Sequence, residues 1–311
     1  MKIHNPYNII PILLMYVLFA NTFTIGKLVM GLASPVFFIG VRMTIAGLIL
    51  LGYTTLIEKK SLRVHKEQYW LFGLLALLHI YIAYIAEFWA LKYVLSYKAC
   101  LLYNLSPFIT ALCTYALCQE SLSPKKILGL MVGFIGFIPI FMSSIPEEVA
   151  AGHWGFITLP ELMLVISVVS SALGWLIFRN LITKHGYSSF VLNGYAMLFG
   201  GIMALGTSFA WEGMPSIGQT GSSQEILMFA GYTAYMILIA NIIGYNLYGI
   251  LLRTYSPTLL SFFGFTTPLF AAVNGFLFLK EPISIAFIVS VLIVSIGLYL
   301  FYQEELKEKT F

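Results

Sequence analysis

The stretch NLSPFITALCTYALCQESLS, residues 104–123, recurs in altered form as FTTPLFAAVNGFLFLKEPIS, residues 265–284. A shift of 161 positions aligns the two stretches without a gap. The aligned positions include a proline, a glutamate and a serine at the same spacing: Pro107, Glu120 and Ser123 in the first copy, and Pro268, Glu281 and Ser284 in the second. Overall identity is low, so this ordered set carries the argument. The pattern indicates that the chain contains an internal duplication.

The composition is that of a protein that lies in a lipid bilayer. Of its 311 residues 59% are hydrophobic and 10% are charged, whereas a soluble domain usually has about 25% charged residues. A spanning helix needs about 20 mostly apolar residues, and the sequence has ten such runs, at residues 9–29, 35–57, 70–90, 99–118, 125–143, 159–178, 188–210, 226–248, 258–279 and 283–302. These runs lack the alternation of apolar and polar residues that is typical of the strands of a membrane barrel. We therefore predict an all-α polytopic membrane protein with ten transmembrane helices.

The duplication divides these spans into two sets of five. The predicted repeats are residues 9–143 and 159–302, and because five is an odd number the second repeat starts on the opposite side of the membrane. Such an inverted repeat is associated with alternating access. Pro107 and Pro268 lie at the same place in the fourth and ninth spans, where a proline removes a backbone hydrogen bond and bends a helix. They are candidate hinges, and the alternative is that they only shape the packing.

Basic residues concentrate on one side of the predicted spans. Of the 17 lysines and arginines, twelve lie there: Lys2, Lys59, Lys60, Arg63, Lys66, Lys125, Lys126, Arg179, Lys184, Arg253, Lys307 and Lys309. By the positive-inside rule both termini are cytoplasmic. The net charge of +4 is thereby explained by topology, and no nucleic-acid partner is expected. Glu147, Glu148, Glu212 and Glu225 lie in the opposite loops without a lysine or arginine nearby in the sequence.

Several segments resemble one family of transporters. The stretches ALKYVLSYKACLLYNLSPFITAL (90–112), QESLSPKKILGLMVGFIGF (119–137) and SPTLLSFFGFTTPLFAAVNGFLFLKEPIS (256–284) look like the EamA family of the drug/metabolite transporter superfamily. SPVFFIGVRMTIAGLILL (34–51) resembles the second helix of that family, including its arginine at Arg42. The resemblance covers nearly the whole chain as two EamA-like halves. It implies ten helices, cytoplasmic termini, a bacterial inner membrane and the movement of small organic metabolites.

Glu87 is the sharpest candidate for a functional group. The chain has no aspartate, and a charged side chain at a helix centre costs at least about 2.5 to 3.5 kcal/mol, so it is functional by default. His79 lies two turns earlier on the same helical face, and Tyr84 lies on an adjacent surface. Glu87 can bind a substrate amine or sulfonium, or carry a proton. The alternative is an internal ion pair with Lys92, Lys98 or Arg42.

Further candidates are polar or aromatic residues in other spans. Asn241, Tyr245 and Tyr248 share one helical stripe that can form hydrogen bonds and stack on a flat ring; the alternative is hydrogen bonding between helices. The remaining candidates are Tyr16, Asn21, Tyr103, Asn104 and Trp175. Family resemblance, and not spacing, implies that the first, third, fourth, sixth, eighth and ninth helices enclose a cavity that several of these residues would line.

Enzyme chemistry is not expected. The lack of aspartate excludes aspartyl intramembrane proteolysis, none of the five histidines is followed by glutamate as HExxH requires, and there is no glycine-lysine phosphate loop. All three cysteines fall in the fourth span, so no disulfide framework, metal site or cofactor is predicted. A structural or sensory subunit would be expected to have an appended domain or long loop, which this sequence does not show.

The predicted function is transport of a small-molecule metabolite across the bacterial inner membrane. The fourth helix is similar, more narrowly within the family, to S-adenosylmethionine transporters of obligate intracellular bacteria. The favoured substrate is therefore S-adenosylmethionine, exchanged for S-adenosylhomocysteine, and the alternative is an amino-acid or drug/metabolite exporter of the same family. A glutamate among aromatic rings suits a cationic ligand of this kind.

Overall fold

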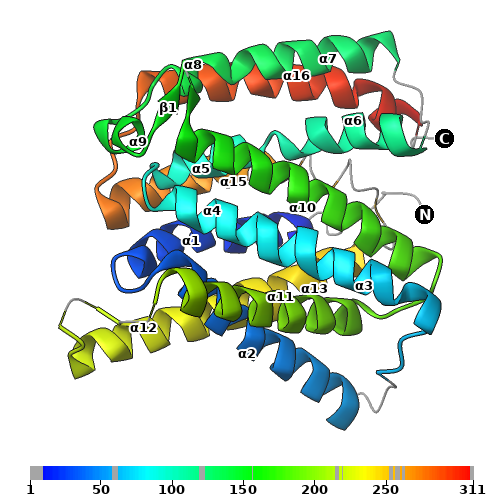
Figure 1. Ribbon diagram of the computed structural model, residues 1–311. Coiled ribbons are helices and arrows are strands. Elements are labelled where there is room, and N and C mark those ends of the chain that lie inside the picture. The colour runs from blue at the N-terminus through cyan, green and yellow to red at the C-terminus, as the bar shows by residue number, and fades with distance from the viewer. Residues whose placement is uncertain are drawn as a thin grey trace. The chain divides into compact units, whose positions relative to one another are not determined.

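The computed structural model describes residues 10–57, 62–118, 123–155, 157–213, 217, 218, 220–251, 255, 260 and 263–308. These residues are almost entirely helical (Figure 1). The described strands are β1 (His153–Trp154) and β2 (Ile157–Thr158), which form one short antiparallel pair. Among the described residues, eight helical runs are long and apolar enough to cross a membrane. The prediction of an all-helical polytopic membrane protein is confirmed.

The elements of the first half begin and end as follows: α1 Ile10–Met30, α2 Pro35–Leu56, η2 Lys66–Gln68, α3 Tyr69–Leu75, η3 Ala76–Ile82, α4 Ala83–Leu91, α5 Ser96–Tyr103, α6 Ser106–Cys118, α7 Pro124–Gly136, α8 Ile138–Phe141 and α9 Pro146–Ala150. Those of the second half are α10 Leu159–Thr183, α11 Ser189–Trp211, α12 Ser223–Met236, η4 Ile237–Gly244, α13 Tyr245–Leu251, α15 Thr267–Asn274, η5 Gly275–Leu279 and α16 Ile285–Glu308. The segments η3, η4 and η5 are π-helical, and η2 is a 3₁₀ turn.

The two expected spans that are not among the eight long helices are the fourth and the ninth. The fourth is interrupted at residues 104–105, between α5 and α6, and the ninth is interrupted at residues 265–266, before α15. These interruptions correspond under the 161-residue shift. Each helix resumes one residue before its proline, so Pro107 and Pro268 lie in a first helical turn, where the missing N–H is not needed. The prolines therefore follow a break and do not bend the middle of a helix.

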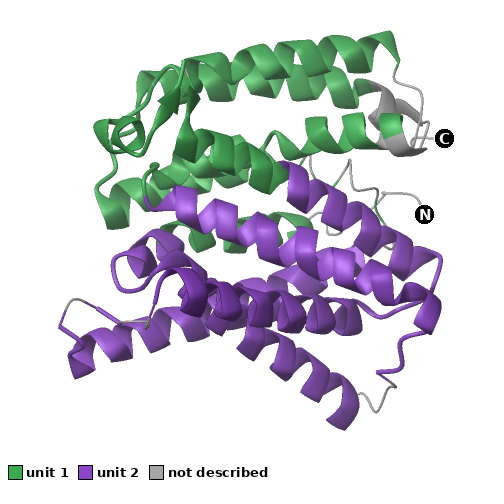
Figure 2. Cartoon of the chain, in the orientation of Figure 1, with its two compact units in different colours: residues 1–24, 93–168, 255–311 green, residues 25–92, 169–254 purple. Residues whose placement is uncertain are grey.

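The chain forms two compact units, which Figure 2 shows in different colours. Unit 1 contains Met1–Thr24, Tyr93–Val168 and Tyr255–Phe311, and unit 2 contains Ile25–Lys92 and Val169–Thr254. The units divide after Lys92 in the first half of the sequence and after Thr254 in the second half. These two boundaries match to within one residue under the 161-residue shift. Each unit therefore combines segments from both halves of the sequence, and the units cut across residues 9–143 and 159–302.

Within unit 1, α7 packs along α16 at glycine contacts (Figure 1). A Cβ added at Gly129 would lie 2.5 Å from the backbone N of Phe301, and one added at Gly297 would lie 2.4 Å from the backbone N of Gly133. Small residues let two helix backbones approach this closely, which is a main source of helix association in membranes. The glycines of GLMVGFIGF (129–137) thus serve packing within the chain.

The repeated serines of the two halves each cap the helix that follows. Ser123 Oγ accepts a hydrogen bond from the backbone N–H of Lys126 at 3.3 Å, at the start of α7. Ser284 Oγ accepts one from the backbone N–H of Phe287 at 3.1 Å, at the start of α16. Such caps satisfy donors that a helix start leaves open.

Some residues named from the sequence lie outside the described residues, namely Glu120, Lys2, Lys59, Lys60, Arg253 and Lys309.

Glu281 caps a helix that is distant in the sequence. Lys280 ends η5 in the left-handed conformation, with φ of 56°, and the chain turns so that Glu281 follows at once. The Glu281 carboxylate accepts hydrogen bonds from the backbone N–H of Ser96, at 2.9 and 3.0 Å, and from Ser96 Oγ at 2.6 Å. A negative charge at this position stabilises the N-terminus of α5. This contact joins the two sequence halves within unit 1.

Lys98 holds a buried ion cluster in unit 1. Its Nζ lies 2.6 Å from Glu148 Oε2 on α9 and 2.7 Å from Glu161 Oε1 in the first turn of α10, and all three side chains are at most 1% exposed. Burial raises the pKa of the Glu148 carboxyl, and the Lys98 ammonium opposes that rise. Glu148 has no basic residue nearby in the sequence, and the fold supplies its partner from 50 residues away.

Unit 2 is built around α2 and α11, which also cross at glycines. A Cβ at Gly47 would lie 2.5 Å from the backbone N of Leu198, and a Cβ at Gly201 would lie 2.5 Å from the backbone N of Thr44. The π-helical segments η3 and η4 begin at Ala76 and Ile237, which correspond under the 161-residue shift. Each of these segments packs on a helix of the other half of the sequence: η3 packs on α11, and η4 packs on α2.

Candidate functional site

Unit 2 contains seven of the eleven predicted site residues, namely His79, Tyr84, Glu87, Trp175, Asn241, Tyr245 and Tyr248. Five rings pack together there, and we call this group the aromatic cluster: His79, Tyr84, Trp175, Tyr245 and Tyr248. The Trp175 ring centroid lies 4.3 Å from those of His79 and Tyr248 and 5.4 Å from that of Tyr245. The hydroxyl of Tyr84 donates a hydrogen bond to that of Tyr245. The cluster offers several aromatic faces and edges at short range.

The two π-helical segments contribute polar side chains to this region. His79 lies in η3, and Asn241 lies in η4. π-helical turns are rare and occur frequently at functional sites, where they redirect side chains. Gly174 of α10 makes room for η3, because a Cβ there would lie 2.5 Å from the Cβ of His79. Ser170 of the same helix donates a hydrogen bond to the carbonyl of Leu78 at 2.7 Å.

Arg42 is a buried cation beside the aromatic cluster. It projects from α2, is 1% exposed, and its Nε donates a hydrogen bond to Asn241 Oδ1 at 2.8 Å. Its Cζ lies 5.6 Å from the ring centroid of Phe38, 5.1 Å from that of Tyr84 and 5.4 Å from that of Phe88. These cation–π contacts and the hydrogen bond stabilise a charge that would otherwise be costly in a membrane.

Sequence reasoning missed part of this arrangement. Arg42 was considered as a match to the family's second helix and as an ion-pair partner of Glu87, but not as a site residue, and neither were Phe38 and Phe88. Two signals were present: Arg42 is a charged residue within an apolar span, and Phe38 precedes it by four residues on the same helical face. The predicted stripe of Asn241, Tyr245 and Tyr248 does contribute all three residues to one region.

Asn241 contacts both the Arg42 guanidinium and the side chains of two methionines in unit 2. Its side chain is fully buried, and its Nδ2 donates to Met43 Sδ at 3.1 Å and to Met197 Sδ at 3.6 Å. Sulfur is a weak acceptor, so the strong hydrogen bond of this amide is the one that its oxygen accepts from Arg42. Asn241 therefore fixes the orientation of the guanidinium.

We expect Asn241→Leu to lower the free energy of unfolding by about 1 to 3 kcal/mol, because the buried Nε–H of Arg42 loses its acceptor. Thermal unfolding of the purified protein in detergent measures this loss. The matched control is Asn180→Leu in α10, since Asn180 is only half-buried and its Oδ1 accepts no hydrogen bond from the described residues. Equal losses in the two variants would contradict the dependence on Arg42.

Glu87 belongs to α4 and is 8% exposed. Tyr84 interacts electrostatically with both the Arg42 guanidinium and the Glu87 carboxylate. The region thus contains a cation, an anion and aromatic rings, which are the groups that recognise a zwitterionic ligand with a flat ring. Lys98, one of the alternative partners of Glu87, binds Glu148 and Glu161 in unit 1.

The other four predicted site residues belong to unit 1, where they have their own contacts. Tyr16 donates a hydrogen bond from its hydroxyl to the carbonyl of Leu260 at 2.7 Å. Asn21 Oδ1 accepts one from Asn274 Nδ2 at 2.7 Å. Asn274 was not predicted, although it is a polar residue within the ninth span. These contacts join the first and ninth spans.

Tyr103 and Asn104 lie at the interruption of the fourth span. The Tyr103 hydroxyl shares a hydrogen bond with that of Ser167, and its ring centroid lies 5.6 Å from that of Phe23. Asn104 is 6% exposed, and its Nδ2 has no hydrogen-bond partner among the described residues. A buried amide donor without a partner is uncommon and marks a position where a ligand or water would be favourable.

Comparison with known proteins identifies the family. The model of the EamA-like transporter family matches residues 7–142 and 158–303. The S-adenosylmethionine/S-adenosylhomocysteine transporter of Chlamydia muridarum is 31% identical over 308 residues, covering 97% of this chain and 94% of the relative. The protein of the same name from Chlamydia trachomatis serovar L2 is 31% identical over 296 residues, covering 94% and 88%.

More distant matches agree with these. The uncharacterized transporter YvbV of Bacillus subtilis is 24% identical over 271 residues, covering 87% of this chain and 83% of the relative. A solved crystal structure superposes with a TM-score of 0.65 at 16% identity, covering 94% of this chain and 96% of that one, and so has the same fold. The names describe transporters and not enzymes. The chain is a multi-pass membrane transporter that belongs to the EamA-like transporter family.

Proposed function

We propose that this protein exchanges S-adenosylmethionine for S-adenosylhomocysteine across a bacterial inner membrane. The observation that carries the proposal is the placement, within unit 2, of the aromatic cluster beside the Arg42 guanidinium and close to Glu87. The names of the Chlamydia relatives support it, because their identity of 31% extends over most of the chain.

The three chemical parts of S-adenosylmethionine correspond to the three kinds of group in this region. The adenine ring stacks on the faces of Trp175 and Tyr245. The sulfonium is attracted by the Glu87 carboxylate and by aromatic faces, as quaternary cations are. The ligand carboxylate pairs with Arg42, whose planar fork suits a carboxylate. S-adenosylhomocysteine lacks the methyl group and the sulfonium charge, so the contacts of the sulfonium with Glu87 and with the aromatic faces distinguish the two ligands electrostatically.

We further propose that transport proceeds by alternating access between two inverted five-helix repeats, residues 9–143 and 159–302, with both termini cytoplasmic. The matched interruptions at residues 104–105 and 265–266 support this, as do the matched segments η3 and η4. Pro107 and Pro268 would act as hinges at these interruptions, because a proline has no N–H and cannot continue the helical hydrogen bonds across them. Tyr16, Asn21, Tyr103 and Asn104, which belong to unit 1, stay predicted substrate contacts.

A countertransport assay tests the substrate. Liposomes that contain the purified protein and are preloaded with S-adenosylhomocysteine are expected to accumulate labelled S-adenosylmethionine faster than unloaded or protein-free liposomes. Uptake of a neutral amino acid without uptake of S-adenosylmethionine would reject the proposed substrate and favour an amino-acid transporter of the same family.

Glu87→Gln is expected to weaken binding of S-adenosylmethionine about 10-fold to 100-fold, because a hydrogen bond or contact to a charged group is worth about 1.5 to 3 kcal/mol. Binding of S-adenosylhomocysteine is expected to change by less than about threefold, since it has no sulfonium charge to lose. Competition against labelled uptake measures both affinities. Glu147→Gln, on the exposed face of α9, is the control. An equal loss for both ligands would assign Glu87 to packing.

A further inference from the structure

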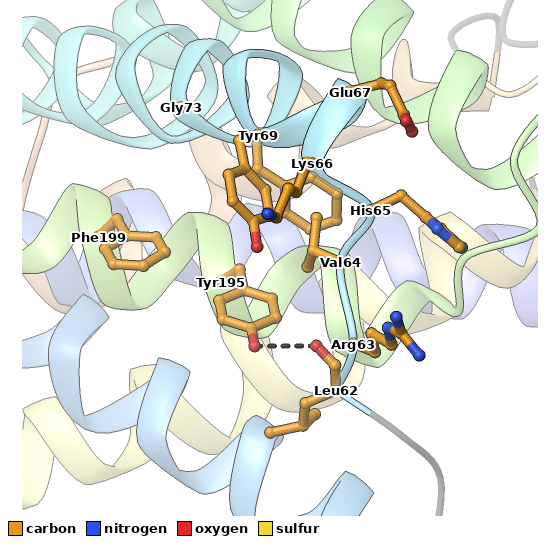
Figure 3. Close-up of a pocket in the computed structure, with 11 residues that line it drawn as sticks. Leu62, Arg63, Val64, His65, Lys66, Glu67, Tyr69, Gly73, Tyr195 and Phe199 are labelled. Atoms are coloured by element: carbon orange, nitrogen blue, oxygen red, sulfur yellow. Dashed lines mark hydrogen bonds between the residues drawn. The ribbon is translucent and has the colours of Figure 1, made fainter.

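A pocket opens in unit 2, and none of the residues that line it belongs to the aromatic cluster (Figure 3). Its volume is about 860 Å³, and its walls are formed by the segment 62–67, by α3 and by α11. The α2 span ends at Leu56, and the next span begins at Lys66. The pocket therefore lies where two spans leave the hydrocarbon layer, which is the level of lipid headgroups.

The lining combines a positive charge with aromatic rings. Lys66 and Tyr69 lie next to each other in Figure 3, above Tyr195, and Phe199 forms a further part of the wall. Tyr69 is 57% exposed and Phe199 is 47% exposed, so the pocket is open on a side lined by aromatic side chains. Tyrosines of this kind are enriched at the membrane interface, where one end of the ring is apolar and the other is wet.

The charges around the pocket favour an anionic occupant. In Figure 3 Lys66 is the charged side chain that lies beside the Tyr69 ring, whereas Arg63, His65 and Glu67, the one acidic lining residue, are directed away from the Tyr69 and Tyr195 rings. Tyr195 donates a hydrogen bond to the Leu62 carbonyl at 3.0 Å and so holds the basic segment against α11. Basic pockets beside transmembrane helices bind anionic lipid headgroups.

Gly73 keeps this pocket open. It lies in α3 and lines the pocket, and a Cβ added there would have no heavy atom within 4 Å. A glycine inside a helix costs about 1 kcal/mol relative to alanine, and no close helix contact requires it at this position. Its effect is to leave a groove on α3 that a larger side chain would fill.

We propose that this pocket binds one anionic phospholipid, with the phosphate on Lys66 and the first part of an acyl chain in the groove at Gly73. A lipid is favoured over a soluble anion because the open side is lined by aromatic residues at the headgroup level, and a net negative charge is required by the basic lining. The site is independent of the proposed substrate.

Binding of phosphatidylglycerol and phosphatidylcholine to the full chain in neutral detergent, followed by native mass spectrometry, tests the proposal. The unchanged protein is expected to bind one phosphatidylglycerol at least about 10-fold more tightly than phosphatidylcholine, as for one charged contact of about 1.4 kcal/mol. Lys66→Gln is expected to abolish this preference, and Gly73→Leu to weaken binding of both lipids. The matched controls Lys125→Gln in α7 and Gly231→Leu in α12 are expected to bind as the unchanged protein does, because Lys125 is exposed in unit 1 and Gly231 has open space around it.

Three results would overturn the proposal. These are equal binding of the two lipids by the unchanged protein, unchanged binding in both pocket variants, and complete displacement of phosphatidylglycerol by soluble glycerol phosphate, which would assign the pocket to a soluble anion. Gel filtration checks that each variant is folded. If Lys66→Gln is unstable, Gly73→Leu still tests the proposal, since a Cβ at Gly73 meets no heavy atom within 4 Å.

Discussion

Replacement of Lys98 by methionine is expected to lower the free energy of unfolding by about 3 to 5 kcal/mol, because it leaves Glu148 and Glu161 buried without a positive partner. Both carboxylates lie within 2.7 Å of the Lys98 ammonium and are not exposed to solvent. Methionine has a similar length, so the variant removes the charge and keeps most of the packing. Thermal unfolding in detergent measures the effect.

Two further variants separate the charge from the packing at this cluster. Burial raises the pKa of the Glu148 carboxyl, so a neutral glutamine replaces this group easily. Glu148→Gln is therefore expected to lower the free energy of unfolding much less than Lys98→Met does. In the double variant, Glu148→Gln should restore part of the stability that Lys98→Met removes. Lys125→Met, at an exposed position of α7, is the control. A loss for Lys98→Met no larger than that control would refute a structural role for the cluster.

The helical membrane fold was predictable because a bilayer leaves few choices for an apolar chain. Backbone groups in hydrocarbon must be satisfied within helices, so long apolar runs such as Pro35–Leu56 and Ser189–Trp211 were found from hydropathy alone. The matched prolines located the irregular spans, but hydropathy cannot distinguish a bend from a break. At residues 104–105 and 265–266 the helix breaks, and each proline lies in the first turn of the helix that follows.

The ion cluster shows what one sequence does not reveal. From the sequence, Lys98 was considered as a partner of Glu87, but a charge in a membrane protein can pair with any residue that the fold brings near. Glu148 and Glu161 are brought to it by α9 and α10. Hydropathy and spacing describe one helix at a time, so contacts between distant segments were not available.

The candidate site was predictable only where helical spacing within one helix groups its residues. Helical spacing placed His79 and Glu87 on one face, and it grouped Asn241, Tyr245 and Tyr248. It did not predict the π-helical segments η3 and η4, which change the spacing locally. It also missed the contact between Arg42 and Asn241, because those residues lie 199 positions apart.

Gly297→Leu is expected to lower the free energy of unfolding by about 3 kcal/mol, the upper end of the usual cost of overpacking. A Cβ at Gly297 would lie 2.4 Å from the backbone N and 2.6 Å from the Cα of Gly133, and 2.9 Å from the carbonyl O of Gly129. All three atoms are backbone atoms of α7, so a side-chain rotation cannot relieve the conflict. The two helices must separate, and the close packing that holds them together in a bilayer is lost.

The matched control is Gly206→Leu in α11, where a Cβ would meet no heavy atom within 4 Å. Both substitutions replace a helical glycine with a better helix former, so the gain in helix propensity is the same, about 1 kcal/mol or less, and cancels in the comparison. Thermal unfolding of the two variants in the same detergent isolates the steric term. If both variants were as stable as the unchanged protein, α7 and α16 could not be packed backbone to backbone at Gly297. If both were destabilised equally, the cost would come from the leucine itself and not from the crossing of these helices.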